Sequence, residues 1–127
     1  MSTAPPISAA RYSAAVWARF CHPTFAGAPN EAAVTACVED AAHHLRLCLH
    51  YVHGAVRFTV IGCPTTIALA DFCAERLSEG VVPDGQAMVD ALEIDASHRH
   101  CVLLCEDAIN AVLDMASPAG AFIRSTP

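Results

Sequence analysis

The 127-residue sequence contains no lysine: its seven basic residues are all arginine, against thirteen acidic residues. The missing lysine excludes Schiff-base chemistry and a P-loop. The net charge of -6 argues against a nucleic-acid surface, because phosphate binding requires clustered basic side chains. No apolar run approaches the ~18 residues of a membrane helix, and no basic segment followed by an apolar stretch opens the chain. We therefore expect a protein that binds neither nucleic acid nor membranes and stays in the cytoplasm.

The composition is typical of one globular domain. Hydrophobic residues make up 54% of the chain, which is enough for a single core at this length. Prolines in the first seven residues indicate a loose tail over 1–7, and the Ser117-Pro118 pair ends the last helical pattern. We expect one domain over residues 8–117 and a second tail over 118–127.

Helical patterns lie at both ends of the domain and in its middle. Ser8 can cap a first helix, and Pro64 suits the first turn of another that should run to about Glu79. A shorter helix is expected around residues 84–92, and the last helix follows His100. Its apolar face should contain Leu104, Ala108, Val112 and Met115.

Alternating patterns predict strands between the first two helices. Between His43 and Val52, one face contains Leu45, Leu47, Leu49 and Tyr51, and the other contains His44, Arg46, Cys48 and His50. His53-Gly54 is a plausible turn into a second alternating run over 56–61, and a short strand over 33–38 precedes both. These elements predict an α+β domain with a small antiparallel sheet.

Seven cysteines are many for this length. Their number is odd and no secretion signal accompanies them, so a disulfide framework is not expected. Reduced thiols, some of them metal ligands, fit the composition better.

Three cysteines and one histidine occupy positions suited to a metal site. Cys63 lies at a strand-to-helix junction, and Cys101, preceded by His100, begins the last helix; both positions stabilise a thiolate. Cys37 lies where the first strand should end, with Glu39 on the same face. Three thiols and an imidazole suit zinc or an iron–sulfur cluster. We expect Cys37, Cys63, His100 and Cys101 to converge, although their spacing is not that of a zinc finger.

The other cysteines and histidines have simpler interpretations. Cys105 lies one helical turn after Cys101. It is either an auxiliary thiol that carries sulfur or shields the site, or a residue of the core. A place in the core is also the alternative for the site cysteines, because buried cysteines behave as small hydrophobes. Cys48 and Cys73 are interpreted as structural, and the histidines between 43 and 53 as a solvated face.

Two longer motifs resemble those of a known family. Residues 100–111, H-C-V-L-L-C-E-D-A-I-N-A, are similar to the H-C-S-x-L-A-E-D-A-I-x-A segment of iron–sulfur cluster assembly scaffolds of the IscU type, also found as the N-terminal domain of NifU. R-F followed by G-C-P-T-T-I-A over 57–68 resembles their R-F-x-x-x-G-C-x-x-x-I-A. Ala36-Cys37 followed by Glu39 resembles A-C-G-D, and the interval from Cys37 to Cys63 agrees without a gap. The likeness covers roughly Tyr12 to Met115.

The resemblance implies a three-stranded antiparallel sheet packed against several helices, in a scaffold that is not a turnover enzyme. Cys37, Cys63 and Cys101 would bind a transient [2Fe-2S] cluster, with His100 as an additional ligand and Glu39 as the carboxylate that keeps it labile. Sulfur would come from a cysteine desulfurase and iron from a frataxin-like donor, and apo-protein recipients would take the cluster. Apo forms of such scaffolds hold zinc in the same place.

The sequence also departs from that family. Glu39 stands where the family has aspartate, and Pro64 where it commonly has glycine. The L-P-P-V-K segment bound by specialised Hsp70 chaperones reads I-D-A-S-H over residues 94–98, so transfer by that chaperone route is not expected. Two other functions stay open: a zinc-bound sulfur acceptor that relays persulfide through Cys101 or Cys105 without building a cluster, and a structural zinc domain.

Overall fold

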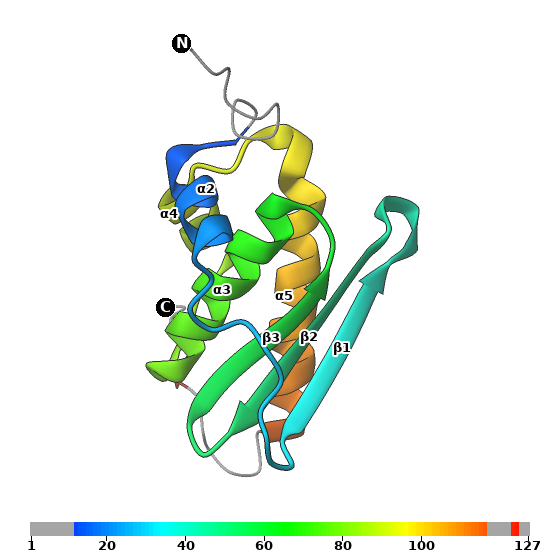
Figure 1. Ribbon diagram of the computed structural model, residues 1–127, viewed down its shortest axis with the longest axis vertical. Coiled ribbons are helices and arrows are strands. Elements are labelled where there is room, and N and C mark those ends of the chain that lie inside the picture. The colour runs from blue at the N-terminus through cyan, green and yellow to red at the C-terminus, as the bar shows by residue number, and fades with distance from the viewer. Residues whose placement is uncertain (1–11, 117–122, 125–127) are drawn as a thin grey trace.

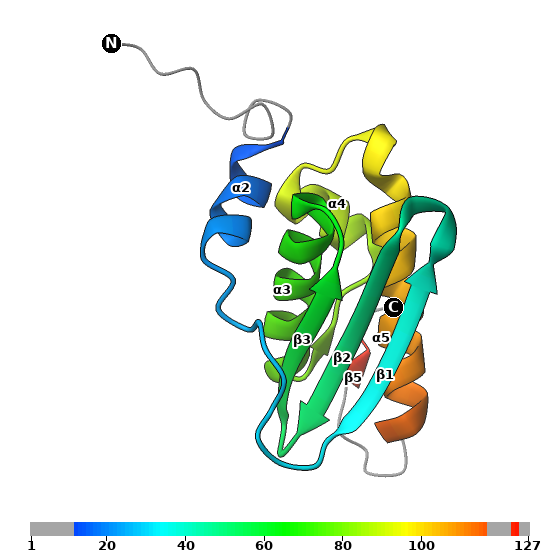
Figure 2. The same ribbon diagram turned by 45° about the vertical axis from the view of Figure 1, so that its right-hand side comes forward.

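The computed structural model describes residues 12–116 and 123–124 of the chain. Its centre is an antiparallel sheet in the order β1-β2-β3, formed by Val34–Asp40, Leu45–Val52 and Ala55–Ile61. Helix α5 (Arg99–Ala116) packs on β1 and β2, and α3 (Pro64–Ser78) packs on β3, so both cover one face of the sheet (Figures 1 and 2). The expected α+β fold with a three-stranded antiparallel sheet is confirmed.

The remaining elements pack around these two helices. Helices α2 (Ala14–Cys21) and α4 (Gly85–Leu92) contact α3, and two 3₁₀ turns precede β2 and α5 over Ala41–His43 and Ala96–His98. A short parallel pair joins β4 (Val81–Val82) to β5 (Ile123–Arg124). None of the helices in the described part of the chain combines the length and the apolar character needed to cross a bilayer.

The strands are those that the alternation predicts, but their ends and one face differ. The first strand continues to Asp40, beyond the expected end at residue 38, while His53-Gly54 forms the expected turn with positive φ at both residues. The prediction that Cys48 and His50 face solvent is wrong: they are 7% and 9% exposed. Cys48 forms a disulfide bond with Cys37, which contradicts the expectation that all thiols are reduced.

His50, on the central strand, contacts a hydroxyl group on each neighbouring strand. Its Nδ1 lies 3.0 Å from Thr35 Oγ1, and its Nε2 lies 3.1 Å from Thr59 Oγ1, on the strands to either side. Burial lowers the pKa of His50, because the charged ring is disfavoured away from water. The residue therefore joins three strands as a polar cross-link rather than belonging to a solvated histidine face.

The helices begin and end close to the expected residues. Pro64 starts α3 and Ser78 ends it, with Glu79 as the cap and Gly80 at φ 81°. Helix α2 is capped by Ser13, whose hydroxyl accepts from Val16 N–H and donates to the Leu92 carbonyl at 2.6 Å. The expected cap at Ser8 lies outside the described residues.

The buried face of α5 differs from the prediction at one position. Leu104, Ala108 and Val112 are buried as expected, but Met115 is 54% exposed and Ala116 takes the next buried place. The buried residues recur every four positions along this helix, so the fourth falls at 116.

An ion pair in a buried setting ties α2 to α3. Asp71 is 2% exposed; its carboxylate accepts from Arg19 at 2.8 Å and from Phe25 N–H at 2.8 Å. Arg19 also contacts Glu75 at 2.6 Å. The position of the loop after α2 therefore depends on one carboxylate in the middle of α3.

We predict that Arg19→Met lowers the free energy of unfolding by about 2 to 4 kcal/mol, because it leaves the Asp71 carboxylate buried without its cation. Arg46→Met is the matched control: its partner Glu39 is 61% exposed, and the expected loss is under about 1 kcal/mol. Urea denaturation followed by circular dichroism measures both. Equal losses of unfolding free energy in the two variants would contradict the stabilising role of the Arg19–Asp71 ion pair.

Candidate functional site

Three parts of the chain meet at one end of the molecule. The β1–β2 connection, the junction between β3 and α3, and the start of α5 all lie at the same end of the sheet (Figures 1 and 2). The antiparallel register explains this, because Asp40 pairs with Leu45 and Arg46 pairs with Ile61, just before the junction. The first residues of both helices therefore face each other beside the connection.

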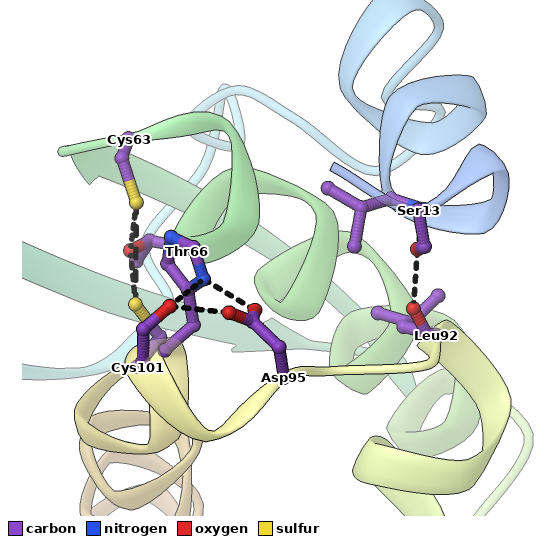
Figure 3. A network of polar contacts seen from close by, with 9 residues as sticks. Ser13, Cys63, Thr66, Leu92, Asp95 and Cys101 are labelled. Atoms are coloured by element: carbon purple, nitrogen blue, oxygen red, sulfur yellow. Dashed lines mark hydrogen bonds and ion pairs between the residues drawn. The ribbon is translucent and has the colours of Figure 1, made fainter. Parts of the chain in front are cut away.

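Cys63 and Cys101 are brought together there, as the sequence predicts. Cys63 occupies the N-cap of α3, and Cys101 lies in the first turn of α5. Their Sγ atoms are 4.0 Å apart, and the Thr66 hydroxyl lies 3.3 Å from each sulfur (Figure 3). Cys63 is half-buried, whereas Cys101 and Thr66 are both 0% exposed. The site is a dithiol with one accessible and one buried sulfur.

The two thiols have opposite protonation preferences. The pKa of Cys63 is lowered to about 4, mainly by the hydrogen bond from Cys101 and, beyond that, by Thr66 and the backbone N–H groups of Thr66 and Thr65. The pKa of Cys101 is raised far above its ordinary value by the same bond to Cys63 and by burial. Of the two, Cys63 therefore loses its proton more easily, and Cys101 is the one that keeps its proton and donates it to Cys63.

His100 lies beside this pair but faces a different neighbour. Its ring stacks on His43 with centroids 3.8 Å apart, and His43 Nδ1 lies 2.8 Å from the Asp40 carboxylate. The contact with His43 lowers the pKa of Asp40.

A second histidine lies close to His100. The ring of His98 is 6.3 Å from the His100 ring, and its Nδ1 lies 2.6 Å from the Asp95 carboxylate. Hydrogen bonds from Ser97 and then His98 lower the pKa of Asp95 to about 2. Two histidine–aspartate pairs thus flank His100.

Cys37 does not join the other three predicted ligands. It lies in the middle of β1, exposed on the face away from the helices, and is bonded to Cys48 directly opposite it on β2. Cys48 in turn faces Thr59, four residues before Cys63, which at about 3.3 Å per residue is roughly 13 Å along the sheet. Convergence is therefore seen for Cys63 and Cys101, not for all three cysteines.

The two auxiliary residues contact groups other than the dithiol. Glu39 is on the strand face that carries Cys37 and contacts Arg46 at 3.3 Å. Cys105 is 0% exposed, and its pKa is raised by a hydrogen bond to Cys73 and by burial. Cys105 and Cys73 lie between α3 and α5 as members of the core. Cys105 takes the packing role that the sequence left open.

An open pocket of about 290 Å³ lies next to His100. The β1–β2 connection and the exposed side of α5 line it with acidic, imidazole and apolar groups: Glu39, Asp40, Ala41, His100, Leu103, Leu104 and Asp107. Leu103 is 54% exposed although it is apolar. The pocket therefore opens beside His100, while Cys63 and Cys101 do not line it.

Sequence reasoning missed Thr66, Asp40 and His43. Thr66 carries a usable signal, because a residue three positions after a helix N-cap faces back toward the capping side chain. Asp40 and His43 have the same three-residue spacing across a turn, and His43 N–H bonds Asp40 at 3.2 Å. Only the fold shows that this turn lies against His100.

The described residues contain no group of three or more His, Cys, Asp or Glu side chains arranged to hold a metal ion. The chemistry available without rearrangement is that of two adjacent sulfurs with an imidazole nearby. No protein-family model matches the chain, and a search of curated proteins finds no match.

We predict that Thr66→Val raises the pKa of Cys63 from about 4, because the hydroxyl that stabilises the thiolate is lost. The pH dependence of Cys63 alkylation by iodoacetamide measures this shift, in a Cys21→Ser background that removes the exposed competing thiol. Thr65→Val is the matched control, since Thr65 is also buried and the variant keeps its backbone N–H. Identical profiles for the two variants would rule out the role of the hydroxyl.

Proposed function

We propose that this protein is a scaffold that accepts sulfur from a cysteine desulfurase and transiently assembles a [2Fe-2S] cluster at Cys63 and Cys101. The observation that carries the proposal is the contact of 4.0 Å between the two sulfurs, which lowers the pKa of Cys63. Thiolates are the preferred ligands of iron–sulfur clusters. The motifs around residues 57–68 and 100–111 that resemble the IscU type contain these two cysteines.

Sulfur transfer to Cys63 requires only the groups that the site provides. The Cys63 thiolate attacks the outer sulfur of a persulfide on the donor; the donor sulfur leaves as a thiolate, and Cys63 then carries the persulfide. Cys63 is the accessible member of the pair, and Cys101 stays protonated behind it. The transfer therefore begins at Cys63.

Iron and the cluster are cargo of this site rather than permanent parts of the fold. Cys63 and Cys101 supply two ligands, and His100 supplies a third when its ring leaves the stack with His43. The pocket that His100 lines is open, which suits delivery of iron by a frataxin-like donor and release to an apo-protein recipient. Zinc accepts the same thiolate and imidazole donors and would compete for them.

A sulfur relay without cluster assembly is the second candidate. It is favoured by the pairing of Cys37 with Cys48, which leaves two thiols rather than three at the site. A permanent structural zinc site needs four closed ligands, and the described residues bring no such set together, so it is not proposed.

Anaerobic reconstitution with ferrous iron, cysteine and a desulfurase tests the scaffold. We expect the absorbance and circular dichroism of a [2Fe-2S] cluster in the wild type and their loss in Cys63→Ala and Cys101→Ala. Cys37→Ser should retain the signal, because Cys37 lies roughly 13 Å along the sheet from the pair. Cys21→Ser, which removes an exposed thiol elsewhere, is the matched control.

Two results would contradict this assignment. Loss of the cluster in Cys37→Ser would mean that Cys37 is a ligand, as the family resemblance implies, and that the sheet differs in the loaded state. If mass spectrometry finds one added sulfur atom on Cys63 but cluster absorbance never develops, the protein is a sulfur relay that does not assemble a cluster.

A further inference from the structure

The dithiol is asymmetric in access. Cys63 is partly exposed, whereas Cys101 is 0% exposed. An external sulfur donor can therefore reach Cys63 alone, and Cys101 can act only on what Cys63 carries. Paired thiols with one accessible and one buried member form intramolecular disulfides readily when their sulfurs are in contact.

We propose that Cys101 is a resolving thiol that converts a persulfide on Cys63 into free sulfide and leaves a Cys63–Cys101 disulfide. The inference deepens the proposed function, since it takes Cys63 as the sulfur acceptor. It assigns to the chain a persulfide reductase activity, with low-molecular-weight or protein persulfides as the substrate class.

The reaction balances with the two side chains and one persulfide. Cys101 sulfur attacks the inner sulfur of Cys63–S–SH; a Cys63–Cys101 bond forms, and the bond between the inner and outer sulfurs breaks. The outer sulfur leaves with the electron pair of that bond and takes up the Cys101 proton, so H₂S is released. Cys101 is oxidised and the outer sulfur is reduced. A thiol reductant, such as a dithiol protein, reopens the disulfide for another round.

The structure points to Cys101 rather than to another cysteine. Cys101 is the thiol in contact with Cys63, at 4.0 Å, and Thr66 contacts both sulfurs at 3.3 Å and keeps them side by side. Cys73 and Cys105 are packed in the core at 1% and 0% exposure. Cys37 and Cys48 are already bonded to each other. Thr66 is therefore a positioning residue for the same step.

The test uses the full-length protein in a Cys21→Ser background, with Cys63 and Cys101 reduced and the Cys37–Cys48 bond intact, and treats it with glutathione persulfide under anaerobic conditions. Released sulfide is measured over time, and peptide mapping by mass spectrometry locates persulfides and disulfides. In the wild type we expect sulfide in proportion to protein and a disulfide between the peptides that contain Cys63 and Cys101. In Cys101→Ser, the persulfide should stay on Cys63 and sulfide release should slow at least about tenfold.

Cys105→Ala is the matched control on the same helix, one turn further along, and should release sulfide like the wild type. Cys101→Ala serves as a second variant if the serine impairs folding, and the wild-type disulfide map needs no variant. A stable persulfide on Cys63 of the wild type, or unchanged sulfide release from folded Cys101→Ser, would overturn the resolving role.

The scaffold and the resolving role fail separately. Reconstitution with ferrous iron and inorganic sulfide bypasses the persulfide step. A chain that builds the cluster from inorganic sulfide yet keeps a stable persulfide lacks only the resolving activity. A chain that releases sulfide and closes the Cys63–Cys101 disulfide without ever holding a cluster lacks only the scaffold function.

Discussion

Strand register is the constraint on which the arrangement of the cysteines depends. The pairing of Cys37 with Cys48, and of Cys48 with Thr59, fixes where β3 ends relative to the other strands: its last residue, Ile61, pairs with Arg46, next to the Asp40–Leu45 pair. Cys63 follows two residues later, beside the first turn of α5, where Cys101 lies. A shift of one residue would turn Leu47 and Leu49, both fully buried, toward the opposite face, so burial of the core holds the register in place. The dithiol is thus positioned by apolar packing some distance away from it.

The sequence predicted correctly the features that depend on neighbouring residues, and it failed for those that depend on which strand residues pair. Pro64 and the helix starts are local signals, and they correctly predicted that Cys63 and Cys101 meet. The position of Cys37 is not local: it depends on whether β1 ends at residue 38 or continues to Asp40, which alternation does not specify. An interval between cysteines that agrees with a family therefore says little about contact when a hairpin connection lies between them.

Burial of Cys48 and His50 was missed for a related reason. Both lie on the strand face opposite the helices, where polar residues usually meet water. Here Cys48 is bonded to a cysteine on β1, and His50 contacts hydroxyl groups on both neighbouring strands. These contacts are between cross-strand neighbours, which only the strand register identifies. The opposed pKa shifts of Cys63 and Cys101 likewise come mainly from one contact between two helices.

The disulfide between Cys37 and Cys48 closes a covalent ring around the β1–β2 connection. The two residues are eleven positions apart, and the ring contains Asp40 and His43, the pair that stacks against His100. A closed loop of this size has far fewer conformations than an open one. The connection therefore has fewer conformations at the end of the sheet, where His43 stacks on His100 of α5. The ring thus limits the movement of His43, which stacks on His100, and its disulfide uses neither Cys63 nor Cys101.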